Sequence, residues 1–350
     1  MRAGVFRGKG RIEVEDVPDP AAGADDVVLD VHGCGVCGSD IGQFRAGSAR
    51  DGQVMGHEFA GTVVEVGARV EGIAEGDLLT GLPIQPCGDC RRCRTGLSHL
   101  CERWTSRSIA FGLPGGFAEK LRIPDARLGA NVHRLPDVAG ATPDAVLDAG
   151  TLVEPLSVAV HAVRLADPGP GRSAVVTGLG TIGLQAAQTL RAKGCGPVIG
   201  VDPSPVRRAV AEELGIVTVD PTVGDDALTG TLCALTGDAE ADIVIEASGV
   251  GALVAEAMEI VRPRGTVVLV ALYHSPATIE PMRAVQREVV LRGSANVTPE
   301  DFRDAIELIG SGAVATTPLL THRLPLERVQ EAFEAQLDAN ASVKVLVTTR

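Results

Sequence analysis

The hydrophobic positions of this chain follow two different patterns, and the change comes near residue 154. Up to about residue 150, short β-rich runs such as DVVLDVHG and FAGTVVEVG are interrupted by glycine and proline. This pattern predicts a barrel-like or mixed β domain with long loops. From about residue 155, nearly continuous apolar runs such as SAVVTGLG, ADIVIEAS and GTVVLVAL alternate with helical stretches. That alternation predicts an α/β fold whose parallel sheet is covered by helices on both faces.

After about residue 295 the pattern changes again. Two helical stretches, PEDFRDAIELIGSG and PLERVQEAFEAQLDA, precede a closing β run, VKVLVTT. A chain of 350 residues is long for one core and suits two domains. We therefore predict a discontinuous first domain, residues 1–153 and 296–350, that brackets a parallel-sheet domain at 154–295.

Composition and charge narrow the classes of partner. The 32 Lys and Arg are outnumbered by 45 Asp and Glu, for a net charge of −13, and aromatic residues make up only 3%. These values argue against nucleic-acid binding and favour a small-molecule partner. No run of about 18 apolar residues suggests a membrane span, and the first twenty residues contain no apolar run of signal-peptide length. We expect a cytoplasmic protein.

A glycine-rich turn opens the parallel-sheet domain. Gly178, Gly180 and Gly183 have the G-x-G-x-x-G spacing, after a strand and at the start of a helix, with Thr181 and Ile182 inside the motif. Glycines at these positions allow a tight turn, close approach of a pyrophosphate, and close packing of helix on strand. The free N–H groups and the positive end of the helix dipole then favour phosphate. We predict a Rossmann dinucleotide-binding site.

The next strand, VIGVD, ends in Asp202, 19 residues past Gly183. A carboxylate there can accept hydrogen bonds from the adenosine ribose and repels a 2′-phosphate. NAD is therefore the predicted cofactor and NADP the less favoured one. Arg207 and Arg208 follow closely, and they weaken the exclusion of NADP.

Four cysteines lie within fifteen residues, in the segment CGDCRRCRTGLSHLC. Cys87, Cys90, Cys93 and Cys101 can close a tetrahedron of thiolates around zinc and leave no open position for substrate. Disulfides between neighbours this close would strain the backbone, and a reducing compartment disfavours them. An iron–sulfur cluster would also accept four thiolates, but no other motif suggests electron transfer. The prediction is a structural zinc.

Chemistry at a metal requires an open site, and the chain offers scattered ligands for one. They are Cys37 in GCGVCGSD, His57 and Glu58 in MGHEFAG, and Glu154 in EPLSVAVHA. These motifs, the four-cysteine segment and GLGTIGLQAAQ occur in the order found in zinc-dependent medium-chain dehydrogenases, which the whole chain resembles. The resemblance is nearest the polyol (sorbitol) and threonine dehydrogenase branch, because the third ligand position is Glu154 rather than cysteine.

The resemblance implies a GroES-like catalytic domain, with a structural zinc lobe at residues 86–102, joined to the Rossmann domain. It implies a second, catalytic zinc held by Cys37, His57 and Glu154, with Glu58 able to exchange into the shell. A homodimer or homotetramer is expected on the same ground.

It also implies roles for three further residues. Asp40 would orient His57, Ser39 would hydrogen-bond the substrate oxygen and start the proton path, and Lys344 would reach the cofactor phosphates. The implied reaction is hydride transfer between a secondary alcohol or polyol and NAD, with zinc as Lewis acid.

Two positions depart from the family pattern. Many relatives have a histidine three residues after the Ser39 position, where this chain has Gly42, so a proton relay through that site is absent. Sorbitol dehydrogenases have an arginine where this chain places Asn296. Two alternatives stay open: an amino-alcohol dehydrogenase acting on threonine or an aminocyclitol, and a non-catalytic relative that binds NAD and zinc.

Overall fold

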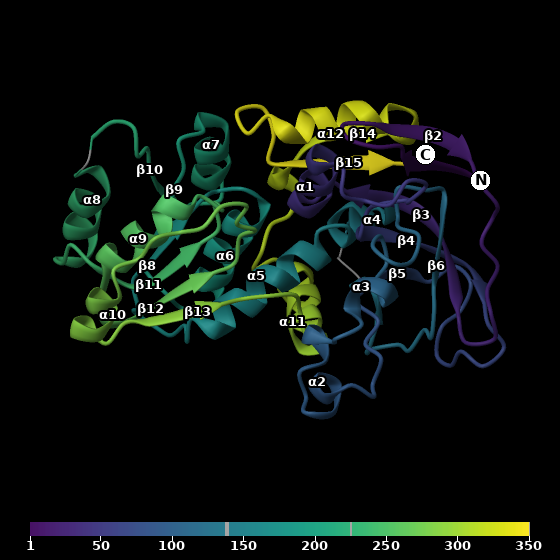
Figure 1. The fold of residues 1–350 in the computed structure, drawn as a ribbon, viewed down its shortest axis with the longest axis horizontal. Helices are drawn as coiled ribbons and strands as arrows, with labels where there is room; N and C mark the ends of the chain where they lie inside the picture. The colour runs from purple at the N-terminus through teal and green to yellow at the C-terminus, as the bar shows by residue number, and fades with distance from the viewer. Residues whose placement is uncertain (137–139, 225, 350) are drawn as a thin grey trace.

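The protein consists of two sheet-centred halves that lie side by side (Figure 1). The computed structural model describes residues 1–136, 140–224 and 226–349. The elements of the N-terminal half are β1 (Arg2–Phe6), β2 (Ile12–Asp16), β3 (Val27–Gly35), α1 (Gly38–Ala46), β4 (Glu58–Val66), β5 (Leu78–Gly81), α2 (Arg91–Arg94), η1 (Ser98–Leu100), α3 (Trp104–Arg107), β6 (Lys120–Ile123), β7 (Val132–Arg134) and α4 (Pro143–Gly150).

The middle of the chain forms the second half. Its elements are α5 (Val153–Leu165), β8 (Ala174–Thr177), α6 (Thr181–Ala192), β9 (Val198–Val201), α7 (Pro205–Glu213), β10 (Val217–Val219), α8 (Ala227–Thr236), β11 (Ala241–Glu246), α9 (Gly251–Ile260), β12 (Val261–Leu269), α10 (Pro281–Arg287) and β13 (Val290–Gly293). The strands form a parallel sheet in the order β10-β9-β8-β11-β12-β13. The chain proceeds outward from β8 in one direction and then from β11 in the other. The crevice at the carboxyl ends of β8 and β11 is therefore a topological switch point, where such sheets bind ligands.

The C-terminal segment returns to the N-terminal half. It contains α11 (Pro299–Gly310), η2 (Thr317–Leu319), β14 (Leu320–Pro325), η3 (Leu326–Arg328), α12 (Val329–Leu337) and β15 (Lys344–Thr348). Strand β15 pairs with β3, in a mixed sheet of order β14-β15-β3-β4-β5-β7, with β6 also paired to β3. Figure 1 shows the yellow β15 beside the purple β3, so the two ends of the chain build one sheet together.

Helix α5 connects the halves. It is buried along most of its length and packs against α6 and α11. The predicted boundary between residues 153 and 154 thus falls at the first turn of a continuous helix rather than in a linker. Within the described parts of the chain, no single helix is long and apolar enough to cross a membrane. Helices α4 and α5, which are bent by 46° relative to each other, together have the length and composition of a span.

Candidate active site

Three of the predicted metal ligands meet at one end of the N-terminal sheet. Cys37 follows β3 and precedes α1, while His57 and Glu58 stand at the start of β4. Because β3 and β4 run antiparallel with Gly35 opposite Glu58, the end of one strand lies beside the start of the other. The donor atoms of Cys37, His57 and Glu58 all lie within 4.8 Å of one another. Thiolate, imidazole and carboxylate are the ligands that zinc uses.

Asp40 lies behind His57. Its side chain is fully buried in the first turn of α1, where one oxygen accepts the Cys37 N–H at 3.1 Å and the other lies 3.7 Å from His57 Nδ1. Burial raises the pKa of Asp40. Burial alone would lower the pKa of His57, but Asp40 and Cys37 outweigh it and raise that pKa well above its ordinary value. A carboxylate beside one ring nitrogen fixes the imidazole so that the other nitrogen can face a metal.

Glu154 and Lys344 complete the buried charges. Glu154, on the first turn of α5, is not among the three residues whose donor atoms lie within 4.8 Å of one another. Burial raises its pKa to about 7, while the nearby His57 and Lys344 lower that pKa and Glu58 raises it. Lys344, at the start of β15, donates through Nζ to Glu58 Oε2 at 2.5 Å and to the Val36 carbonyl at 3.0 Å.

Lys344, which was predicted to reach the cofactor phosphates, is buried among the candidate metal ligands and paired with Glu58. Its ammonium is 3% exposed and is held inside the ligand cluster, where Glu58 neutralises it.

Ser39 lies in the first turn of α1, and its hydroxyl is buried without a hydrogen-bond partner among the described residues. An unpaired buried hydroxyl is costly, so a group that supplies the missing partner would be favoured there. The predicted role at the substrate oxygen fits this geometry.

The glycine turn has the geometry that the motif predicts. Gly178 has φ +88, and a Cβ there would lie 2.7 Å from the backbone of Ser248. A Cβ at Gly183 would lie 1.8 Å from the Gly178 carbonyl oxygen, so strand and helix touch at this point. At Gly180 the nearest atom would be Arg207 Nη1 at 3.9 Å. The turn is therefore closed on the protein side and open at Gly180, where a pyrophosphate could approach.

The other predicted cofactor residues surround this turn. Thr181 Oγ1 donates to the Val343 carbonyl at 3.1 Å, and Ile182 is half-buried against the core. Asp202 is 4% exposed, and its carboxylate accepts the Leu179 N–H at 2.7 Å and the Ser204 N–H at 2.8 Å. The carboxylate thus already supports the turn.

The four cysteines of the loop around α2 also lie together, with all four sulfurs within 4.8 Å of one another. All eight cysteines of the chain are free thiols. Backbone N–H groups point at the sulfurs: Cys87 and Arg103 donate to Cys101 Sγ, and Cys93 donates to Cys90 Sγ, each at 3.4 Å. N–H groups of Glu102 and Cys93 lower the pKa of Cys90 to about 6. Four converging sulfurs fit a tetrahedral zinc site.

Comparison with known proteins agrees with this geometry. Residues 23–137 match the alcohol dehydrogenase GroES-like domain, and residues 181–311 match the zinc-binding dehydrogenase family. A 2-dehydro-3-deoxy-L-galactonate 5-dehydrogenase of Pseudoalteromonas atlantica is 33% identical, covering 99% of this chain and 98% of the relative. The chain belongs to the zinc-dependent medium-chain dehydrogenases.

Two further similarities extend along the whole chain. A sorbitol dehydrogenase of Bombyx mori is 29% identical over 99% of this chain and 97% of its own length. The crystal structure of a zinc-binding dehydrogenase from Sinorhizobium meliloti, bound to NADP, superposes with a TM-score of 0.89 at 32% identity, covering 99% of this chain and 98% of that one. This dehydrogenase therefore has the GroES-like and Rossmann domains of its family, and it is a zinc-dependent alcohol or polyol oxidoreductase.

Two aromatic residues that belong to none of the sequence motifs lie beside the candidate metal ligands of this dehydrogenase. The ring centroids of Phe111 and His57 are 5.5 Å apart, and those of Trp104 and Phe111 are 5.4 Å apart. Both aromatic residues come from the segment just after the four-cysteine loop. The rarity of aromatic residues, with one tryptophan in the chain, was the available signal.

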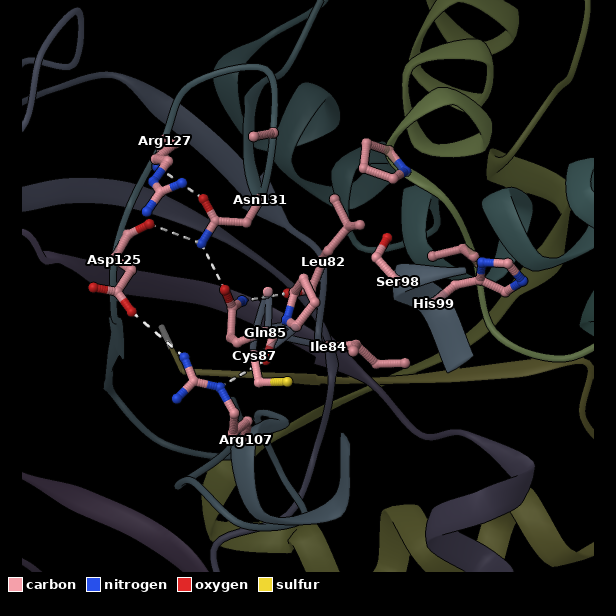
Figure 2. A pocket seen from close by; sticks show the side chains of 15 residues that line it. Leu82, Ile84, Gln85, Cys87, Ser98, His99, Arg107, Asp125, Arg127 and Asn131 are labelled. Carbon is pink, nitrogen blue, oxygen red and sulfur yellow. Dashed lines mark hydrogen bonds and ion pairs between the residues drawn. The ribbon is translucent and has the colours of Figure 1, made fainter. Parts of the chain in front are cut away.

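A separate cavity of about 370 Å³ is lined in part by Cys87, Ser98 and His99 of the four-cysteine loop (Figure 2). Arg107 there donates to the Gln85 carbonyl at 3.0 Å and lies 3.6 Å from Asp125, and Asn131 donates to Gln85 Oε1 at 2.6 Å. Its polar side chains largely satisfy one another, and Cys37, His57 and Glu154 are not part of its lining. Nearby, Asn296 donates to the His99 carbonyl at 2.9 Å.

Proposed function

We propose that this dehydrogenase oxidises a secondary alcohol of a polyol or sugar-derived substrate with NAD, at a zinc held by Cys37, His57 and Glu154. The observation that carries the proposal is the convergence of Cys37, His57 and Glu58 within 4.8 Å, beside the buried Glu154. The names of relatives that act on sorbitol and on a galactonate derivative support the substrate class. Glu58 is a weaker candidate for the resting ligand, because Lys344 already holds its carboxylate.

A zinc ion at this position would supply Lewis acidity, which lowers the pKa of an alcohol. The protein residues do the positioning. Asp40 orients His57. Ser39 accepts a hydrogen bond from the substrate hydroxyl and is the first group to receive the proton of that hydroxyl. Bound NAD, held at the glycine turn beside Asp202, would accept the hydride of the carbinol carbon, so that the alcohol would be oxidised to a ketone.

We infer a preference for NAD from Asp202, whose buried carboxylate lies directly under the glycine turn. A 2′-phosphate next to this charge would be repelled. Arg207, with Nη1 3.7 Å from Asp202, partly offsets that repulsion. Asp202→Ser should therefore lower the ratio of kcat/KM for NAD over NADP by tenfold or more, and an unchanged ratio would remove Asp202 from cofactor selection.

A homo-oligomer is also part of the proposal. Strand β13 is the edge of the parallel sheet, and all four of its residues are exposed. Met282 and Val285 of the adjacent α10 are 53% and 70% exposed. An exposed edge with apolar neighbours favours pairing with a second copy. Leu291→Lys should shift the mass measured by light scattering toward the monomer.

The decisive experiment measures NADH formation with a panel of polyols, sugar acids, small diols, threonine and aminocyclitols, together with zinc per chain. Cys37→Ala should abolish turnover and remove one zinc, while the matched variant Cys34→Ala, at a buried thiol three residues away, should retain both zinc ions. Full turnover by Cys37→Ala would refute the catalytic assignment. Preferential activity with threonine or an aminocyclitol would favour the amino-alcohol alternative.

A further inference from the structure

The space beside α1 that Gly42 leaves open is filled from the other half of the molecule. A Cβ built at Gly42 would lie 3.5 Å from Cε1 and 3.8 Å from Nε2 of His274. His274 is exposed and follows β12, in the segment that leads to α10. The segment therefore leaves the carboxyl end of a parallel strand, at the edge of the sheet where a dinucleotide binds. Its imidazole therefore lies beside the helix that carries Ser39 and Asp40.

Helix geometry places this imidazole next to Ser39. Ser39 and Gly42 are three residues apart in α1, so they share a face, with their Cβ positions about 5–6 Å apart. A ring at van der Waals distance from the Cβ position of residue 42 is within reach of the Ser39 hydroxyl, directly or through one water molecule. That hydroxyl has no hydrogen-bond partner among the described residues.

Two acidic groups of the ligand cluster are already engaged. Asp40 accepts the Cys37 N–H and faces His57, and Glu58 is paired with Lys344. A proton that leaves the substrate through Ser39 thus needs another acceptor on the way to solvent. Histidine takes up and releases protons near neutral pH, and His274 is exposed enough to pass one on.

We propose that His274 is the proton acceptor beyond Ser39, so that the nucleotide-binding half supplies a relay group that α1 lacks. The inference rests on the proposed alcohol oxidation. The substrate O–H proton passes to Ser39 Oγ as the Ser39 proton passes to an imidazole nitrogen of His274, which releases its other N–H proton to water. Gly42 contributes by leaving room for the ring.

The test is single-turnover NADH formation at saturating NAD. His274→Gln should slow it by about 100-fold, the scale of general acid–base catalysis, while zinc content and NADH affinity stay unchanged. Added imidazole should restore much of the rate. Gly42→His in the His274→Gln background should also restore it, because a histidine then projects from α1 into the vacated space.

Gly42→Leu provides a second variant that leaves His274 in the chain but displaces its ring, and it should lose rate to a similar extent. The matched control His322→Gln removes a half-buried histidine on β14 whose Nδ1 lies 3.1 Å from the hydroxyl of the neighbouring Thr321. Its rate should be unchanged and insensitive to imidazole. A His274→Gln rate within twofold of the wild type would overturn the relay.

A second readout does not depend on turnover. It is the NMR spectrum of the zinc-loaded enzyme without substrate. The chain has seven histidines, and the Cε1–H resonance of His274 can be assigned because it disappears in His274→Gln. Gly42→Val should shift this resonance, and an unmoved signal would refute the contact. A wild-type enzyme that is silent on every alcohol would refute the proposed function, whereas an active wild type with an unimpaired His274→Gln would refute only the relay.

Discussion

Removing the buried ammonium of Lys344 should destabilise the ligand cluster by an amount that its geometry defines. Lys344 and Glu58 form an ion pair at 2.5 Å, with side chains 3% and 1% exposed, and Nζ also donates to the Val36 carbonyl. Burial alone lowers the pKa of Lys344, but Glu58, Cys37 and Glu154 outweigh it and raise that pKa. The ammonium is therefore charged, and it neutralises a crowded set of acidic groups.

Lys344→Met keeps most of the side-chain volume but leaves the Glu58 carboxylate buried without its partner. Breaking such a pair costs about 3–5 kcal/mol, whereas replacing both partners by uncharged groups costs much less. The double variant Lys344→Met/Glu58→Gln should therefore be more stable than the sum of the single effects predicts, by about 2 kcal/mol or more.

The assay is denaturant unfolding of the wild type, both single variants and the double variant, each in zinc-loaded and zinc-free form. In the zinc-loaded protein the loss in Lys344→Met should be smaller, because the freed carboxylate can turn to the metal. Additivity of the single effects within about 0.5 kcal/mol would refute the conclusion that these residues form a coupled buried pair.

Three further predictions concern the rest of the molecule. Gly183→Ala should destabilise the protein, because its Cβ would lie 1.8 Å from a backbone oxygen, while Gly180→Ala, with 3.9 Å of clearance, should leave stability unchanged and weaken NADH binding at least tenfold by fluorescence titration. Cys93→Ala should remove one zinc and lower the melting temperature, whereas Cys233→Ala, at an exposed thiol, should change neither; an unchanged melting temperature in Cys93→Ala would contradict a structural zinc. Burial lowers the pKa of His133 from 6.5 to about 4, so as the pH falls the unfolded chain takes up this proton before the folded protein does, and stability falls below pH 6.5. Between pH 7 and pH 5 this one group should lower the free energy of unfolding by about 2 kcal/mol. The free energy of unfolding of His133→Leu should therefore change less over this pH range, by that amount.

The local parts of this protein could be predicted from the sequence. The parallel sheet follows from apolar strands that alternate with helices, and the glycine turn follows from a spacing that fixes backbone approach within six residues. The four-cysteine site is equally local, since its ligands lie within fifteen residues. The family resemblance also predicted that Cys37 and His57 belong to one site, and the pairing of β3 with β4 brings them together.

Lys344 shows where such reasoning stops. Its position on a short closing strand gives no indication of which carboxylate it meets, because its partner Glu58 is 286 residues away in sequence. The same holds for His274, which approaches α1 only because the two halves pack against each other, and for the aromatic residues beside His57. Chemistry that depends on short spacings was determined by the sequence itself. The partners of buried charges and of unpaired hydroxyls were decided by the tertiary structure, because desolvation makes each such group depend on whichever distant segment packs over it.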